Sequence, residues 1–183
     1  YVLAVDTDSL YITLDRLVSA VMPDEKDVTK VVDFLDRVCE EKLEPFIDRS
    51  YADLGKYVNA YEQKMVMKRE AIADRGIWTA KKRYILNVHN NEGVQYKEPK
   101  LKIMGIEAIK SSTPEICRDE LKSLFTTIMT KDEESVQKQI ADFKQVFVSA
   151  SPEQVAFPRG VNELDKWKDS ETVYSKGTPI HVR

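Results

Sequence analysis

YVLAVDTDSLYITL, residues 1–14, decides the fold of this chain because two apolar stretches flank one polar turn. The stretches on either side predict two strands, and Asp6-Thr7-Asp8-Ser9 predicts the tight turn between them. Two carboxylates one residue apart can hold a hard divalent cation such as Mg²⁺, which prefers oxygen ligands. An ordinary turn is the alternative, since Asp is common in turns. Because apolar strands would anchor this turn in a core, we expect a cation beside Asp6 and Asp8.

A long amphipathic helix is predicted after this hairpin, from Asp24 to Asn59. Apolar residues recur there at steps of three, four or seven, which is typical of a helix face that packs on a core. Pro45 is expected to kink this helix or to mark a junction between two helices.

An antiparallel sheet is predicted next, because β-branched and aromatic residues alternate with charges. Its strands are expected at 61–73 and 77–88, joined near Asp74-Arg75-Gly76. Asn90-Asn91-Glu92-Gly93 predicts the turn into a third strand at 94–96. Glu98-Pro99 is expected to end the sheet.

The last part of the chain predicts helices. Residues 100–110 are expected to form a connector with a short strand, and the spacing of Ser112 and Glu115 predicts a capping box at a helix start. A second helix is predicted from Glu133 to Ala150, and a short one near 163–167. The chain is therefore expected to be an α+β protein with two parts, 1–99 and 100–183.

Charge is distributed unevenly along the chain, although the net charge is only −3. Residues 1–62 carry 7 Lys and Arg against 14 Asp and Glu, whereas residues 63–110 carry 11 against 5. A basic block in an acidic protein predicts a surface that contacts nucleic-acid phosphates, and a solvated charged face is the alternative. No apolar run approaches the roughly 20 residues of a membrane span, so no membrane partner is expected.

Several blocks of the sequence resemble one known family. Val5-Asp6-Thr7-Asp8-Ser9-Leu10-Tyr11 is similar to motif C of the family B DNA polymerases. Further blocks follow in the order found in T-even-like bacteriophage polymerases: Lys68–Ala73, Trp78–Tyr84, Glu98–Gly105, Lys110–Pro114 and Pro179–Arg183. The resemblance implies that residues 1–99 are the C-terminal part of a polymerase palm, with an antiparallel hairpin and sheet, and that residues 100–183 are a partial, helical thumb.

The resemblance also implies the chemistry. A family B polymerase performs template-directed nucleotidyl transfer with two Mg²⁺ ions, one activating the primer 3′-hydroxyl and one holding the triphosphate of the dNTP. Asp8 maps to the indispensable catalytic carboxylate, Asp6 to the accessory one, and Glu70 to an acidic group from an adjacent strand. Without the resemblance, Glu70 would be read as an ordinary surface glutamate.

The basic block maps onto primer-template contacts. Lys and Arg neutralise phosphates without reading sequence, and Arg and Tyr can donate to the minor-groove acceptors that every base pair presents. The implied DNA-binding residues are Lys81, Lys82, Arg83, Tyr84, Lys100, Lys102 and Lys110.

The chain differs from the family in one large respect. The family's motif A aspartate, motif B helix and clamp-binding tail are not found in the chain, so we expect it to be a piece of a longer polymerase or one half of a split one, inactive alone. Self-association or pairing with an N-terminal half is then expected, in the cytoplasm of an infected bacterium. The alternatives are a DNA-binding accessory protein and a Mg²⁺-dependent nuclease that uses Asp6, Asp8 and Glu70.

Overall fold

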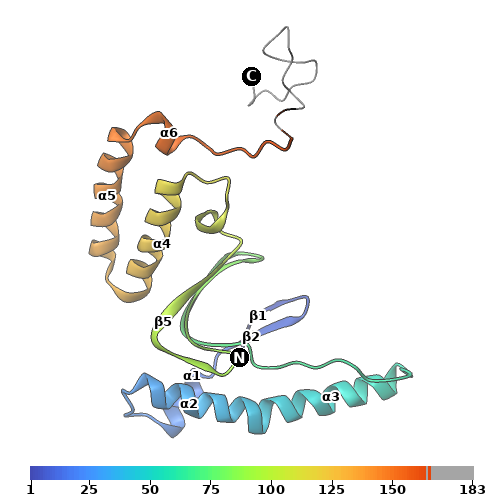
Figure 1. Cartoon of the computed structure of the whole chain (residues 1–183). Helices are drawn as coiled ribbons and strands as arrows, with labels where there is room; N and C mark the ends of the chain where they lie inside the picture. Colours follow the sequence, from blue (N-terminus) through green and yellow to red (C-terminus); the bar gives the residue numbers. More distant parts are fainter. Residues whose placement is uncertain (164, 166–183) are drawn as a thin grey trace. The chain divides into compact units, whose positions relative to one another are not determined.

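The computed structural model describes residues 1–163 and 165 and contains both helices and antiparallel sheets, which confirms the α+β prediction (Figure 1). The chain divides into two compact units, Tyr1–Gly105 and Ile106–Arg183. This division lies after the boundary expected at 99/100, because the third strand of the sheet continues through Pro99. The expected short helix near 163–167 lies largely outside the described residues.

The first unit opens with the predicted hairpin. Strand β1 (Val2–Asp6) pairs antiparallel with β2 (Ser9–Ile12), and Asp6 is opposite Ser9. Thr7 and Asp8 therefore form the turn, and Thr7 adopts a positive φ of 48°. No residue of either strand is buried. A short helix that the sequence pattern did not predict, α1 (Asp15–Val21), follows the hairpin.

The long helix is present and is divided as Pro45 predicted. Helix α2 (Val28–Val38) begins after Asp27, whose side chain accepts a hydrogen bond of 3.0 Å from the Thr29 backbone N–H. It continues through a π-helical turn, η1 (Cys39–Leu43), into α3 (Glu44–Tyr57). The Glu44 N–H bonds the Cys39 carbonyl in η1, one residue further back than in an α-helix.

A three-stranded antiparallel sheet of order β3–β4–β5 completes this unit. Its strands are β3 (Ala71–Ala80), β4 (Arg83–Asn91) and β5 (Val94–Met104). The turn predicted at Asp74-Arg75-Gly76 is wrong, because these residues lie inside β3. The β3–β4 turn is instead at Lys81-Lys82, where Lys82 adopts φ 61°. The predicted turn before the third strand is confirmed at Glu92-Gly93.

Two further expectations about this sheet are wrong. Residues 61–70 form no strand, and Tyr61 and Val66 are exposed. Pro99 does not end the sheet, because β5 is an edge strand. The missing N–H of a proline costs no ladder hydrogen bond where it faces away from the neighbouring strand.

The second unit contains a helical hairpin. A short 3₁₀ turn, η2 (Glu107–Ile109), precedes α4 (Glu115–Thr130), and α5 (Glu133–Ser149) follows as predicted. A last short helix, α6 (Pro152–Val155), comes next. The capping box expected at Ser112 is absent, since Pro114 is the N-cap and no side chain bonds the first turn of α4.

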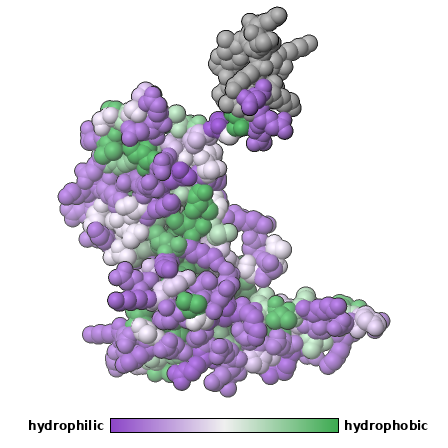
Figure 2. Space-filling model, in the orientation of Figure 1, coloured by the Kyte–Doolittle hydropathy of each residue, from purple (hydrophilic) through white to green (hydrophobic). Residues whose placement is uncertain are grey.

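The core of the first unit lies on β4, where Ile85, Leu86 and Val88 are buried with Asn87 and Asn90. Hydrophilic residues cover most of the face seen in Figure 2, with hydrophobic patches between them. Among residues 1–163 and 165, no helix combines the length and hydrophobicity that a membrane span needs.

Candidate active site

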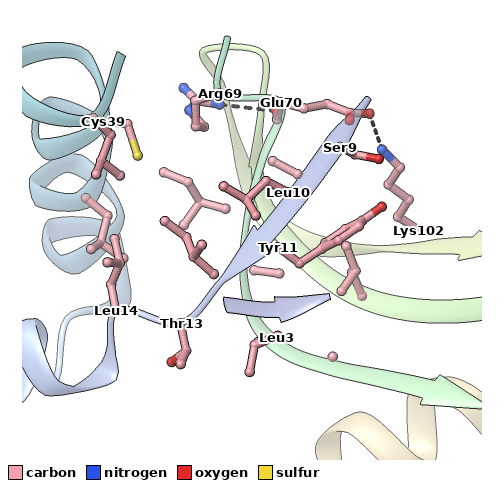
Figure 3. Close-up of a pocket in the computed structure, with 18 of the residues that line it drawn as sticks. Leu3, Ser9, Leu10, Tyr11, Thr13, Leu14, Cys39, Arg69, Glu70 and Lys102 are labelled. Carbon is pink, nitrogen blue, oxygen red and sulfur yellow. Dashed lines mark hydrogen bonds and ion pairs between the residues drawn. The ribbon is translucent and has the colours of Figure 1, made fainter. Parts of the chain in front are cut away.

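A pocket of about 480 Å³ lies in the first unit, between the β1–β2 hairpin, the α2–α3 helix and β3 (Figure 3). Its wall is mainly apolar, with Leu10, Leu35 and Ile72 among the lining residues. The charged residues that line it include Asp8, Arg69, Glu70 and Lys102. The pocket therefore joins two of the three carboxylates that the sequence predicts as metal ligands.

The hairpin turn presents the carboxylates of Asp6 and Asp8. The Ser9 hydroxyl donates to the Asp6 backbone carbonyl at 3.0 Å, which closes the turn. The Thr7 hydroxyl donates to the Asp6 carboxylate at 3.2 Å. Asp8 is exposed at the tip of the turn. The local sequence thus fixes Asp6 on one side and leaves Asp8 open to an incoming ligand.

Glu70 precedes β3 and forms an ion pair with Lys102 of β5. In Figure 3 the two side chains reach toward each other beside Ser9 of β2. A predicted metal ligand and a predicted DNA contact are therefore partners in this structure. The pair brings residues 32 positions apart in sequence to one place on the sheet.

The Lys81-Lys82 turn lies against the hairpin tip. The Lys82 ammonium is 3.6 Å from the Asp6 carboxylate. Gly105, at the end of β5, holds this turn closely, because a Cβ atom at that position would lie 2.2 Å from the Lys82 carbonyl oxygen. Gly105 also has a φ of 67°, which favours glycine. Sequence reasoning assigned no role to Gly105.

Aromatic rings connect the β1–β2 hairpin to strands β3 and β4 of the sheet. Tyr11 of β2 contacts both Trp78 and Tyr84, each with ring centroids 5.4 Å apart and edge-to-face geometry. Burial raises the pKa of the Tyr84 hydroxyl, and a hydrogen bond with Tyr11 and the charges of Glu70 and Asp6 raise it further. Tyr84 therefore stays a neutral donor close to the carboxylates.

Arg69 is the central polar residue that sequence reasoning missed. Its side chain is 10% exposed and forms an ion pair with Asp36 of α2. It also donates to the Asn90 side chain at 2.7 Å, while its backbone N–H donates to Glu44 at 3.1 Å. Lys68 bonds Glu44 as well, and this bond lowers the pKa of the Glu44 carboxyl. The segment that leads into Glu70 is thus fastened to the helix and to β4.

The remaining predicted DNA contacts are placed differently from one another. Arg83 begins β4, and Lys100 lies on β5 with its ammonium 4.4 Å from the Tyr96 ring centroid. Lys110 belongs to the second unit and pairs with Glu107 at 3.0 Å. Within the first unit, the structure therefore brings Lys82, Tyr84 and Lys102 together with the carboxylates.

The carboxylates fit a hard divalent cation by their chemistry, but they do not complete a ligand set. Among residues 1–163 and 165, no three His, Cys, Asp or Glu side chains form a group that could hold a metal ion. Two of the three predicted ligands, Asp6 and Glu70, form ion pairs with lysines. Asp8 and Asp6 would therefore hold a cation only together with further ligands.

Known proteins similar to this chain share one activity in their names. The divergent family B DNA polymerase family matches residues 1–149. The chain is 35% identical to a DNA-directed DNA polymerase of Enterobacteria phage T4 and 38% identical to one of Escherichia phage RB69. Each alignment covers 100% of this chain and 21% of the relative. The chain thus spans about a fifth of the length of these curated relatives.

Proposed function

This chain belongs to the divergent family B DNA polymerases, and on that premise we propose that it forms part of the active site of a template-directed DNA polymerase. Its β1–β2 hairpin acts as motif C, its sheet completes the C-terminal part of the palm, and its second unit is part of the thumb. The alignments with phage polymerases along the whole chain support this proposal.

One observation carries the proposal beyond family membership. The turn with the two aspartates and the turn with the basic block are distant in sequence, yet Lys82 lies 3.6 Å from Asp6. Tyr11 of the hairpin and Tyr84 of the sheet also pack edge to face. Acidic groups suited to metal ions and basic groups suited to DNA phosphates therefore meet at one edge of the unit, as a polymerase requires.

The carboxylates have separate roles in the proposed site. Asp8, open at the tip, is the main ligand for Mg²⁺, and Asp6 is the accessory ligand. Glu70 approaches from the segment that Arg69 fastens to the helix. When bound, two Mg²⁺ ions would lower the pKa of the attacking hydroxyl and neutralise the phosphates of the nucleotide.

The basic groups bind primer-template DNA in this proposal. Lys81, Lys82, Arg83 and Lys100 neutralise phosphates, and Lys102 and Lys110 extend the contact. The neutral Tyr84 hydroxyl donates to minor-groove acceptors. The proposed partners are thus the duplex, a dNTP and further polypeptide that completes the ligand set. A sliding clamp as partner and the cytoplasm of an infected bacterium as location also belong to this proposal.

A chimeric polymerase tests the proposed role of Asp8. The chain would replace its aligned segment in the RB69 relative, and incorporation of labelled nucleotide into a primer would be measured. We expect the chimera to extend primers. Asp8→Ala should lower the rate of incorporation at least about 100-fold, since a carboxylate that holds a metal is lost. Asp53→Ala, an exposed aspartate on α3, is the matched control and should leave the rate unchanged. Equal rates for both variants would contradict the proposal.

The isolated chain provides a second test. We expect no primer extension at any Mg²⁺ concentration, because the described residues offer no group of three ligands. Duplex binding should nevertheless be detectable, independent of sequence and weakened by salt. Extension that Asp8→Ala abolishes in the isolated chain would show that the chain holds a complete site.

A further inference from the structure

Two ion pairs in the candidate site join residues with opposite proposed tasks. Asp6, a proposed metal ligand, is paired with Lys82, a proposed DNA contact, at 3.6 Å. Glu70, a second proposed ligand, is paired with Lys102 in the same way. Within the described part of the chain, the two lysines nearest the carboxylates are therefore already neutralised.

These pairs lie where solvent and DNA can reach them. One side chain of each pair is well exposed, Lys82 at 64% and Glu70 at 57%, and its partner is half-buried, with Asp6 at 26% and Lys102 at 27%. Exposed ion pairs contribute little free energy, so a phosphate can replace the carboxylate beside the ammonium. A lysine that leaves one anion for another adds less to DNA binding than a lysine that was unpaired before.

We infer that Asp6 and Glu70 compete with DNA phosphates for the ammonium groups of Lys82 and Lys102. Neutralising the carboxylates, by substitution or by a divalent cation, releases the two lysines to the duplex. Because coupling between two ligands is reciprocal, DNA that takes up the lysines also frees the carboxylates for a cation. This inference rests on the function proposed above and adds to it a link between cation binding and DNA binding.

The chain contains a matched control for each paired lysine. Lys81 lies beside Lys82 in the same turn, and no carboxylate partner is found for it among residues 1–163 and 165. Lys100 lies two residues before Lys102 on β5, and its ammonium contacts the Tyr96 ring instead of a carboxylate. Each comparison therefore keeps the strand or turn constant and changes the partner of the lysine.

The first experiment is a double-mutant cycle on duplex binding by the whole chain, in EDTA, at 50–200 mM salt. Lys82→Asn is preferred to an alanine substitution, since asparagine tolerates the positive φ at this position. Each phosphate neutralised by a lysine contributes a slope of about −0.9 in log K against log salt. We expect Lys81→Asn to remove about 0.9 from the slope in the parent chain. Lys82→Asn should remove clearly less, because the Asp6 carboxylate that Lys82 leaves takes up a salt cation and so reduces the net release of cations.

The Asp6→Asn background should make the two lysines equal. In that background Lys82→Asn is also expected to reduce the slope by about 0.9. The loss of affinity between 50 and 200 mM salt would then be roughly 3.5-fold smaller than without the substitution. A second cycle with Glu70→Gln, Lys102→Gln and Lys100→Gln should behave in the same way. Coupling in the Asp6 and Lys82 cycle supports the inference.

The outcomes separate the inference from the proposed function. If Lys81→Asn and Lys82→Asn change the slope equally in the parent chain, the turn binds DNA as proposed but the competition does not exist. If neither substitution changes the slope in either background, the turn does not contact DNA, and both proposals fail.

The second experiment uses Mg²⁺ alone, without DNA or nucleotide, and measures acylation of each lysine by mass spectrometry. A lysine held in an ion pair reacts more slowly than its unpaired neighbour. We expect Mg²⁺ to raise the reactivity of Lys82 and Lys102 at least twofold relative to Lys81 and Lys100. Asp6→Asn should raise Lys82 reactivity without Mg²⁺. Reactivity ratios that neither Mg²⁺ nor Asp6→Asn changes would overturn the inference.

Discussion

The β1–β2 hairpin and the β3–β4–β5 sheet are both antiparallel, yet they differ in how they are stabilised. No residue of the hairpin strands is buried, and Val2, Leu3, Val5, Leu10 and Ile12 are exposed. The central strand of the sheet, by contrast, buries residues on both of its faces. The candidate metal ligands Asp6 and Asp8 thus lie on the less packed element, and the Lys81-Lys82 turn lies on the well-packed one.

This difference teaches that the site depends on contacts between the two elements. A two-stranded hairpin is only marginally stable by itself. Tyr11 packing on Trp78 and Tyr84 holds the hairpin beside the sheet, and the exposed Asp6–Lys82 pair adds little to it. The position of the carboxylates is therefore set largely by the sheet.

Hydrogen exchange should show the largest contrast between the two elements. We expect amides of β1 and β2 to exchange at least about 1,000-fold faster than those of β4, because local opening exposes few buried apolar groups in the hairpin. Mass spectrometry of peptides covering 1–14 and 83–91 measures this ratio. Equal protection would mean that another surface covers the hairpin, such as a second copy of the chain, and light scattering would then show a dimer.

Core substitutions should give the next largest effect. Ile85 on β4 is 3% exposed, and Ile85→Ala is expected to lower the free energy of unfolding by about 2–5 kcal/mol, since it leaves a cavity. Ile12 on β2 is 36% exposed, and Ile12→Ala should cost less than about 1 kcal/mol. Urea denaturation of both variants checks the difference. Similar losses would show that the hairpin is as tightly packed as the sheet.

Gly105→Ala should show how firmly the sheet fixes the Lys81-Lys82 turn. A left-handed φ costs an alanine about 1–2 kcal/mol, and at Gly105 the new Cβ would also meet the Lys82 carbonyl oxygen. Gly93→Ala is the matched control, because Gly93 has a φ of 84° but open space around its Cβ position. We expect the unfolding free energy to fall further for Gly105→Ala. Equal losses would show that the turn moves aside without cost.

The smallest expected effect concerns the contact of Tyr84 with the hairpin at alkaline pH. The pKa of Tyr84 is raised in the folded state, first by burial, so its neutral form is favoured there. This contribution to stability is complete below the pKa of about 10 that Tyr84 has in the unfolded chain. It is lost as the pH rises through the pKa of Tyr84 in the folded chain. Tyr84→Phe cannot ionise, and it should therefore weaken the decline of unfolding free energy above pH 10. The exposed Tyr57→Phe should leave the decline unchanged.

The hairpin could be predicted from sequence because its signals are local. Apolar strands and a D-T-D-S turn occupy fourteen consecutive residues, and no distant residue is needed to interpret them. The α2–α3 helix was predicted for the same reason, from its apolar repeat and Pro45. Its start at Val28 instead of Asp24 reflects the Asp27 cap, which competes with earlier helix residues for the first backbone N–H groups.

The sheet was predicted less well because distant contacts decide its turns. Gly76 was read as a turn residue, but it serves close packing, since a Cβ there would lie 2.8 Å from Leu86 and Trp78 side-chain atoms. The true turn at Lys81-Lys82 has no Gly, Asn or Asp to signal it. Pro99 is tolerated only because β5 has one free edge, a fact that sequence periodicity does not contain.

The candidate site could be predicted only in part. Asp6, Asp8, Glu70 and the basic residues came from a resemblance between sequences, and whether they bind metal or DNA stays a prediction. Arg69 was hidden because a lone arginine between Lys68 and Glu70 looks like surface charge. Only the structure shows that it joins Asp36 on the helix to Asn90 on β4.

The π-helical turn η1 has a consequence for chain length. Each residue advances an α-helix by about 100°. The π-helical turn holds one residue more than an α-helical turn, so deleting one residue from Cys39–Leu43 would allow regular α-helical bonding and leave α3 facing nearly the same way. Glu44 would then still face Lys68 and Arg69, which it bonds at 2.5 and 3.1 Å. The helix can therefore lose one residue at η1 and keep the segment before Glu70 fastened to it.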